Sequence, residues 1–179
     1  MIYELNENYF VRNFIEHDLE GAYRQWFEDQ EVCTYNSHGK FFPRFKDLKA
    51  YFESTKGDEL LVWAICHKED GHIGNISLQN ISFIDRRAEL AILLGEKKHW
   101  NKGVSFLAVR SLMEHGFNKL NLEKIHCGTA ENNHGMLALA KKSGMKEEGR
   151  RIKHLWLDGL WVDVIELAIL RDEWIARKA

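Results

Sequence analysis

The sequence predicts a mixed α+β fold, with about seven strands in a mostly antiparallel sheet and four helices in the order β-αα-βββ-α-β-α-ββ. Two observations carry this prediction. Short apolar runs joined by Asp-Gly signals are typical of antiparallel hairpins, and apolar residues spaced three and four apart indicate amphipathic helices between them. No repeat, low-complexity segment or linker interrupts the 179 residues, so we expect one domain over residues 1–179.

The first strand and two helices are expected before residue 60. Tyr9–Phe14 alternates in character and predicts the strand, and Asp18 is a suitable N-cap for the helix that follows it. A polar loop, Asn36–Gly39, comes next. Pro43, the only proline, precedes a second helical pattern, and Gly57 closes that pattern.

Three antiparallel strands are expected in the middle of the chain. Leu60–His67 and His72–Ser82 are joined by a Lys-Glu-Asp-Gly hairpin signal. Asp85–Arg87 then turns the chain into a third run, Ala88–Leu94. Beyond residue 103, apolar residues at helical spacing predict a long helix.

The last third is expected to add a strand, a helix and a hairpin. Lys124–Ala130 predicts the strand, Asn132 or Asn133 caps a helix that runs to about residue 142, and Gly144 ends it. The hairpin has an Asp-Gly turn between two strands, Arg150–Leu157 and Trp161–Leu170.

Composition excludes several classes of partner. The chain carries 25 lysines and arginines against 27 acidic residues, so no global field gathers nucleic acid or an anionic membrane, and we expect neither as a partner. The three cysteines are far apart and the N-terminus lacks a signal-peptide pattern, which predicts a reduced cytoplasmic protein. The nine histidines lack the helical i, i+4 spacing of a zinc site, so no metal is predicted.

The stretch from Trp100 to Ser105 is the strongest functional signal. It joins an apolar strand to a helix, and the unpaired N–H groups at a helix start, with the helix dipole, suit a phosphate or pyrophosphate. Gly103 permits close approach of the backbone, while Lys97, Lys98 and Lys102 add positive charge. The spacing fits neither a Walker loop nor a Rossmann fingerprint. The alternative is an ordinary helix start.

The element order and this turn resemble the GCN5-related N-acetyltransferase (GNAT) family over nearly the whole chain. Within the family, the chain is most similar to the group that includes ribosomal-protein N-terminal acetyltransferases. Family members have a Gln/Arg-x-x-Gly-x-Gly/Ala turn that cradles the acetyl-CoA pyrophosphate. The corresponding positions here are Trp100, Asn101, Lys102, Gly103, Val104 and Ser105. The central glycine is kept, whereas the first position is Trp and the last is Ser.

The resemblance implies acetyl-CoA as the cosubstrate, with no metal. The six turn residues and Lys98 would contact it, Asn133 would approach its pantetheine arm, and the backbone near Ile92 and Leu94 would bind that arm between two splayed strands. Ala140 departs from the family, because many members have at this position the tyrosine that protonates the leaving thiolate. Three candidates for the missing acid are His134, His154 and Cys127.

Glu89 is the candidate catalytic residue. It is a carboxylate within the apolar strand Ala88–Leu94, where an acid is costly unless it is paired or used. The resemblance places a base at this position in several members, and it implies direct attack of an amine on the thioester, with a backbone N–H stabilising the oxyanion and a water-mediated path to Glu89. The alternative is a structural ion pair with Arg86, Arg87 or another cation.

Two functions follow from these observations. The first is acetyl transfer to a primary amine, which could be a protein N-terminus, an amino sugar or a polyamine. The second is a CoA-binding regulatory or catalytically silent module, motivated by Ala140 and Ser105. The expected partner is a small-molecule or peptide amine, with a homodimer as a further possibility. The first two helices and the last hairpin are expected to shape the amine pocket.

Overall fold

The centre of the computed structural model is a sheet with the strand order β1-β2-β3-β4-β5-β6-β8-β7. The structure describes residues 1–36, 39–40 and 44–177. The strands are β1 (Ile2–Glu4), β2 (Tyr9–Asn13), β3 (Leu61–His67), β4 (Gly71–Ser82), β5 (Arg87–Leu94), β6 (Lys124–Ala130), β7 (Lys146–Leu157) and β8 (Leu160–Leu170). The helices are α1 (Tyr23–Trp26), α2 (Phe45–Ser54), α3 (Val104–Asn118), α4 (His134–Lys142) and α5 (Arg171–Ala176), with 3-10 turns η1 (Glu16–Glu20) and η3 (Lys97–His99).

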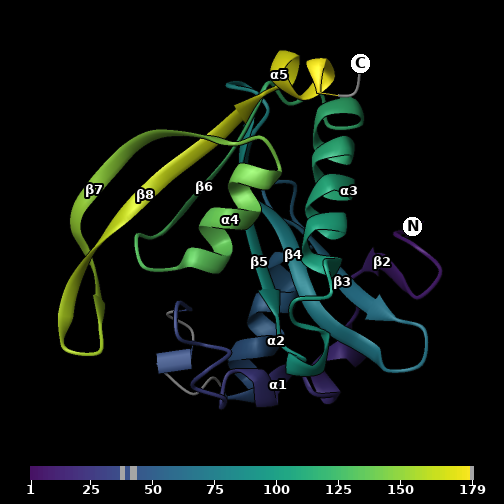
Figure 1. Ribbon diagram of the computed structural model, residues 1–179. Coiled ribbons are helices and arrows are strands. Elements are labelled where there is room, and N and C mark those ends of the chain that lie inside the picture. Colours follow the sequence, from purple (N-terminus) through teal and green to yellow (C-terminus); the bar gives the residue numbers. More distant parts are fainter. Residues whose placement is uncertain (37–38, 41–43, 178–179) are drawn as a thin grey trace.

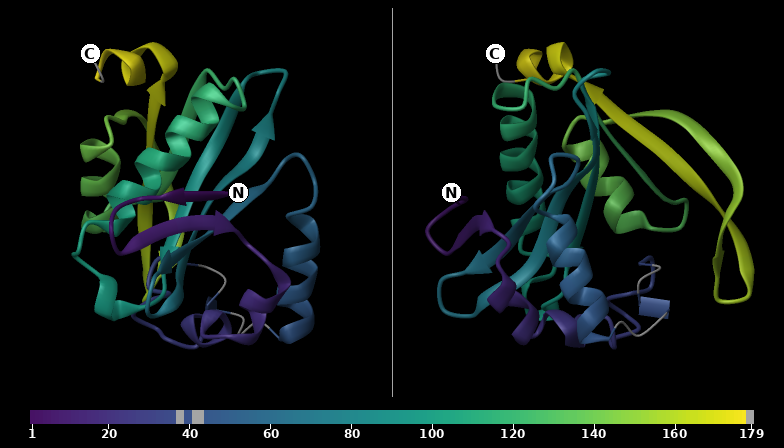
Figure 2. Two further views of the ribbon diagram at one scale, coloured as in Figure 1. Left: turned by 90° about the vertical axis from the view of Figure 1, so that its right-hand side faces the viewer. Right: turned by 180° about the vertical axis from the view of Figure 1, so that it is seen from behind.

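Helices cover both faces of the sheet (Figures 1 and 2). Alternate residues of a strand point to opposite faces, and β3 shows this clearly. Trp63 and Ile65 belong to the larger apolar core under α3 and α4, whereas Val62 and Ala64 belong to a second core under α1 and α2. The central strands are therefore buried on both faces, as their nearly continuous apolar sequences require.

The predicted fold class is confirmed, and the differences are local. The structure adds β1, α5 and a longer β7, which begins at Lys146 and pairs with β8 from there. Three residues, such as those of β1, are too few to show a strand period. Asp18 is not the N-cap of η1 but its third residue, because its carboxylate accepts from the N–H of Ile15 and pairs with Arg12. Pro43 and part of the predicted polar loop lie outside the described residues.

The parallel contact between β5 and β6 is short. Their register pairs run from Arg87 opposite Lys124 to Glu89 opposite His126, and beyond this point the two strands diverge (Figure 1). The splay that the family resemblance implied is therefore present.

Helix α1 is fixed over the end of β5. The indole Nε1 of Trp26 donates to Glu96 at 3.0 Å, and Gly95 lies directly under the ring, since a Cβ on Gly95 would be 1.9 Å from Trp26 Cδ2. In the part of the chain that the structure describes, no helix has both the length and the apolar character to cross a membrane.

Candidate active site

The turn before α3 has the geometry of an anion cradle. Gly103 is the N-cap of α3 and adopts φ +80°, a left-handed conformation that glycine adopts without strain. A Cβ built on Gly103 meets nothing within 4 Å, so the space above the turn is open. Gly103 has no side chain that could cap the first N–H groups of α3. These N–H groups can therefore donate to a phosphate. The residues present fit the phosphate-binding role predicted for Asn101–Ser105.

Trp100 fixes this turn to the end of β5. Its indole Nε1 donates to the carbonyl oxygen of Leu94 at 2.8 Å. The tryptophan that departs from the family motif thus has a structural role here: it ties the cradle to the strand that carries Glu89.

The three lysines near the turn have different surroundings. Lys98 Nζ lies 2.5 Å from Asp70, and Lys97 Nζ lies 2.7 Å from Asp29 and 2.9 Å from Glu31. Lys102 is exposed and forms no ion pair with any described residue. The geometry makes Lys102 the lysine whose charge remains available to an anion at the turn.

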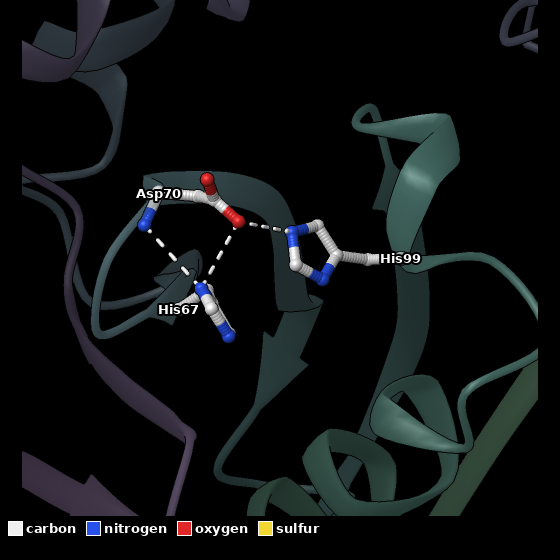
Figure 3. A group of neighbouring side chains, drawn as sticks. All are labelled: His67, Asp70 and His99. Carbon is white, nitrogen blue, oxygen red and sulfur yellow. Dashed lines mark hydrogen bonds and ion pairs between the residues drawn. The ribbon is translucent and has the colours of Figure 1, made fainter.

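A cluster that the sequence did not suggest, His67, Asp70 and His99, lies next to the start of the turn, because His99 immediately precedes Trp100 (Figure 3). His67, Asp70 and His99 come from β3, the β3–β4 turn and η3, and the Asp70 carboxylate lies 3.0 Å from a ring nitrogen of each histidine. His99 is buried, and its other nitrogen lies 2.9 Å from the hydroxyl of Tyr9. Three potential metal-ligand atoms lie within 4.8 Å of one another. Since all three residues have partners within the protein, we interpret the cluster as a brace for the turn.

The inner edge of β5 faces the splay. The N–H of Gly95 donates to Ile73 of β4, and backbone groups of successive strand residues point to alternate edges. The N–H and C=O groups of Ile92 and Leu94 therefore point toward β6, as the Trp100 contact with Leu94 also shows. This is the edge predicted to bind an extended pantetheine arm.

Asn133 lies at the other arm of the splay, just after β6. Its side-chain oxygen accepts from the N–H of Met136 at 3.1 Å and so caps α4, which confirms the predicted cap.

Glu89 lies at the point where β5 and β6 separate. Its partner is Asn80, whose Nδ2 donates to Glu89 Oε2 at 3.1 Å. Arg86 instead bonds Asn121 and pairs with Glu123, and Arg87 pairs with Asp85. No lysine or arginine among the described residues forms an ion pair with Glu89, so the structural pair expected as its alternative role is not found.

His126, for which the sequence suggested only a packing role beside this cleft, is a neighbour of Glu89. It is directly opposite Glu89 in the last pair of the β5–β6 ladder. Burial lowers the pKa of His126, and the charge of Glu89 acts in the opposite direction. A neutral imidazole beside a carboxylate is a suitable proton acceptor. Only the parallel register could have revealed this pair, because the two residues are far apart in the chain.

A cavity of about 540 Å³, here called the acceptor cavity, lies between α1–α2 and strands β4–β5. Its lining includes Tyr23, Tyr51, Asn75, Ser77, Ala91 and Leu93. Asn80, the partner of Glu89, also lines it. The described lining contains two carboxylates, Asp47 and Glu59, and no lysine or arginine.

The three candidate acids lie in different places. Cys127 is buried in the core, where burial raises its pKa to about 12. His154 is exposed and bonds Arg151, and His134 is exposed at the first turn of α4. Ala140 is buried in the core. Of these groups, Cys127 is near enough to Glu89 for the carboxylate charge to add to the rise in its pKa.

Comparisons with known proteins identify the family. The model of the acetyltransferase (GNAT) domain matches residues 9–146. Spermidine N(1)-acetyltransferase of Vibrio cholerae is 25% identical over 176 residues, which cover 98% of this chain and 89% of that protein. YnaD of Bacillus subtilis, named an uncharacterized N-acetyltransferase, is 29% identical over 165 residues, which cover 92% and 94%. YdaF of the same species, provisionally named a ribosomal N-acetyltransferase, is 30% identical over 110 residues, which cover 61% and 60%.

The crystal structure of Vibrio cholerae spermidine N-acetyltransferase with CoA and spermine has the same fold. It matches with a TM-score of 0.85 at 21% identity, over 95% of this chain and 99% of that one. The family resemblance drawn from the turn and the element order is thus confirmed. The chain belongs to the GNAT family, and it is an N-acetyltransferase with acetyl-CoA as its cosubstrate.

Proposed function

We propose that the chain acetylates the primary amine of a small molecule that occupies the acceptor cavity, and that Glu89 takes the amine proton. The observation that carries this proposal is the position of Glu89, at the vertex of the splay and one hydrogen bond from the cavity wall. The absence of a cation from the described lining favours an amine, which arrives as an ammonium ion. The names of the spermidine N-acetyltransferases, which are similar proteins, support a small amine as well.

Each part of the splay has a distinct role in this proposal. Residues Asn101–Ser105 bind the phosphates, and Asn133 with the backbone of Ile92 and Leu94 binds the pantetheine arm. The amine nitrogen bonds to the thioester carbon of acetyl-CoA, the C–S bond breaks, and CoA leaves as the thiolate. The β5 N–H groups that point into the splay are donors for the negative charge that develops on an oxygen placed there.

Glu89 and His126 together provide a path for the proton. An ammonium near Glu89 is attracted by its charge, and the carboxylate, directly or through water, removes the proton that must leave before nitrogen can attack. His126 neighbours Glu89 across the ladder and stays neutral near pH 7 because burial lowers its pKa. It can share that proton.

The test is thiol release from acetyl-CoA with a panel of amines, using wild type and Glu89→Gln. The variant keeps shape and hydrogen bonding but cannot accept a proton, so kcat should fall by ~10²–10⁴ while the acetyl-CoA KM stays nearly unchanged. Glu123→Gln changes a half-buried carboxylate that is paired with Arg86, so it is the matched control and should behave as wild type.

Two results would contradict the proposal. Thiol release that no amine stimulates would remove the small-amine acceptor. A Glu89→Gln variant that keeps its kcat per folded molecule would exclude Glu89 as the base.

A further inference from the structure

The floor of the acceptor cavity is polar where a central strand is expected to be apolar. Asn75, Ser77 and Gln79 alternate along β4 and so share one face, which lies in the cavity. Asn75 is 7% exposed and Ser77 is 4% exposed. Buried polar groups on a central strand cost free energy unless each has a partner. Their partners are therefore informative about what the cavity binds.

Asn75 has a buried amide nitrogen, and the orientation of the amide follows from His72. His72 Nε2 lies 3.0 Å from the carbonyl oxygen of Gly74, which can only accept, so Nε2 carries a proton. The amide atom of Asn75 that lies 2.6 Å from the same Nε2 must then be its oxygen. Its nitrogen, Nδ2, is buried and forms no hydrogen bond of good geometry with a described residue, although Asn75 lies near the Tyr23 hydroxyl and opposes the rise that burial causes in the pKa of Tyr23.

A buried chain of contacts fixes this arrangement. Nδ1 of His72 faces Asp18 at 3.7 Å, and Asp18 forms two hydrogen bonds with Arg12, at 2.7 and 2.6 Å. Burial lowers the pKa of His72. Nε2 carries a proton whichever charge the ring has, because Gly74 offers only an acceptor, so the Asn75 amide keeps its donor side away from His72.

Ser77 presents a donor in the same way. Its Oγ accepts from Nε2 of Gln79 at 2.9 Å, so the hydroxyl hydrogen is left to donate elsewhere. Opposite Ser77 on β5 stands Ala91, whose small side chain leaves room above the hydroxyl. The polar face of β4 in the cavity thus offers two buried hydrogen-bond donors, Asn75 Nδ2 and Ser77 Oγ–H.

An ammonium group cannot satisfy these donors, because it has only hydrogens to offer. The carboxylates that would attract a second or third ammonium of a polyamine lie elsewhere in the lining. Asp47 is bonded to Arg44, and Glu59 is exposed. A hydroxyl or carbonyl oxygen, in contrast, accepts from both donors.

We infer that Asn75 and Ser77 form an oxygen-binding subsite in the acceptor cavity, so that the acceptor is a primary amine carrying hydroxyl or carbonyl oxygens rather than an oxygen-free polyamine. This inference rests on the proposed function. Glu89 stands opposite Gln79, and two or four residues of strand place Ser77 and Asn75 about 7 and 13 Å further along β4. The subsite therefore suits an oxygen several bonds from the amine, as in an amino sugar or a short peptide.

The test compares kcat/KM for four acceptors on the intact protein. Glucosamine and glycylglycinamide carry such oxygens, from a sugar and from a peptide, whereas cyclohexylamine and spermidine carry none. At least one oxygen-bearing amine should exceed both oxygen-free amines by about 10- to 100-fold, since leaving buried donors unpaired is costly. Whichever of glucosamine and glycylglycinamide has the larger kcat/KM shows whether the oxygen belongs to a sugar or to a peptide.

Variants separate the subsite from the reaction. Asn75→Asp keeps the oxygen that His72 bonds but turns the donor into an acceptor, and Ser77→Ala removes the hydroxyl. Each should lower kcat/KM about 10-fold or more for the preferred oxygen-bearing amine and leave the acetyl-CoA KM unchanged. Spermidine turnover should not fall with Asn75→Asp. Ser82→Ala, on the same strand but outside the cavity, is the control. If Asn75→Asp does not fold, Ser77→Ala decides the question.

Two outcomes would overturn the subsite. One is a wild-type enzyme that prefers spermidine or cyclohexylamine, and the other is variants that affect all four acceptors equally. Failure of the proposed function is a different result, in which wild type uses none of the four amines.

Discussion

At the scale of single residues, the site depends on conformations that few side chains adopt. Gly103 and Gly159 have nearly the same backbone, with φ of +80° and +83°, and an added Cβ meets nothing within 4 Å at either position. They differ in location, since Gly103 opens α3 and Gly159 lies in the β7–β8 turn. The pair therefore separates backbone strain from steric obstruction of a ligand.

We predict that Gly103→Asn weakens acetyl-CoA binding by at least 10-fold, because a side chain enters the open space above the turn. Asparagine tolerates the left-handed conformation better than other residues with a Cβ, so the fold should be preserved. Titration calorimetry with acetyl-CoA measures the effect, and Gly159→Asn should bind as wild type does. Equal affinities for both variants would show that the turn is only a helix start.

At the scale of elements, most of the helices and strands could be predicted from the sequence. The Asp-Gly hairpins, the long helix after Gly103 and the capping role of Asn133 could be predicted, because each depends on residues close together in the chain. The pairing of Glu89 with His126 and the orientation of the Asn75 amide could not be predicted. Both depend on strand register and on a histidine proton, which are set by contacts between segments that are distant in sequence.

The cluster of His67, Asp70 and His99 beside the turn before α3 also depends on contacts between segments that are distant in sequence. It joins β2, the β3–β4 turn and η3 through Tyr9, Asp70 and His99. A matched pair exists in the same molecule, because the hydroxyl of Tyr3 lies 3.0 Å from Nδ1 of His115 in the last turn of α3, far along the helix from Gly103.

We predict that Tyr9→Phe lowers the free energy of unfolding by about 1–3 kcal/mol, since it leaves a buried ring nitrogen of His99 unpaired. It should also raise the Kd for acetyl-CoA several-fold, because His99 immediately precedes the turn. Tyr3→Phe should lower stability without changing that Kd. Urea denaturation and calorimetry measure the two effects. If both variants change the Kd equally, the cluster does not position the turn.

At the scale of the whole molecule, buried and half-buried histidines couple the fold to pH. His72, His99, His115 and His126 all have pKa values lowered from the ordinary value, in each case chiefly by burial. They come from β4, η3, α3 and β6, so they are spread over the sheet, the long helix and the segment before the turn at Gly103. Protonation of the native state therefore opposes packing throughout the domain.

We predict that stability falls as the pH is lowered from 7 to 5. Below the unfolded histidine pKa of about 6.5, the unfolded chain binds protons that the native protein does not, so the free energy of unfolding decreases with decreasing pH. Above that pH these histidines are neutral in both states and contribute no slope. The lowered pKa values of carboxylates such as Asp18 act only at lower pH, near and below their ordinary value of about 4.

Urea denaturation between pH 7 and pH 5 measures how the free energy of unfolding depends on pH. His115→Gln, which removes one buried ring, should reduce this dependence, whereas His17→Gln, at an exposed position, should not. A free energy of unfolding that is constant between pH 7 and 5 would contradict the burial of neutral histidines in the native fold.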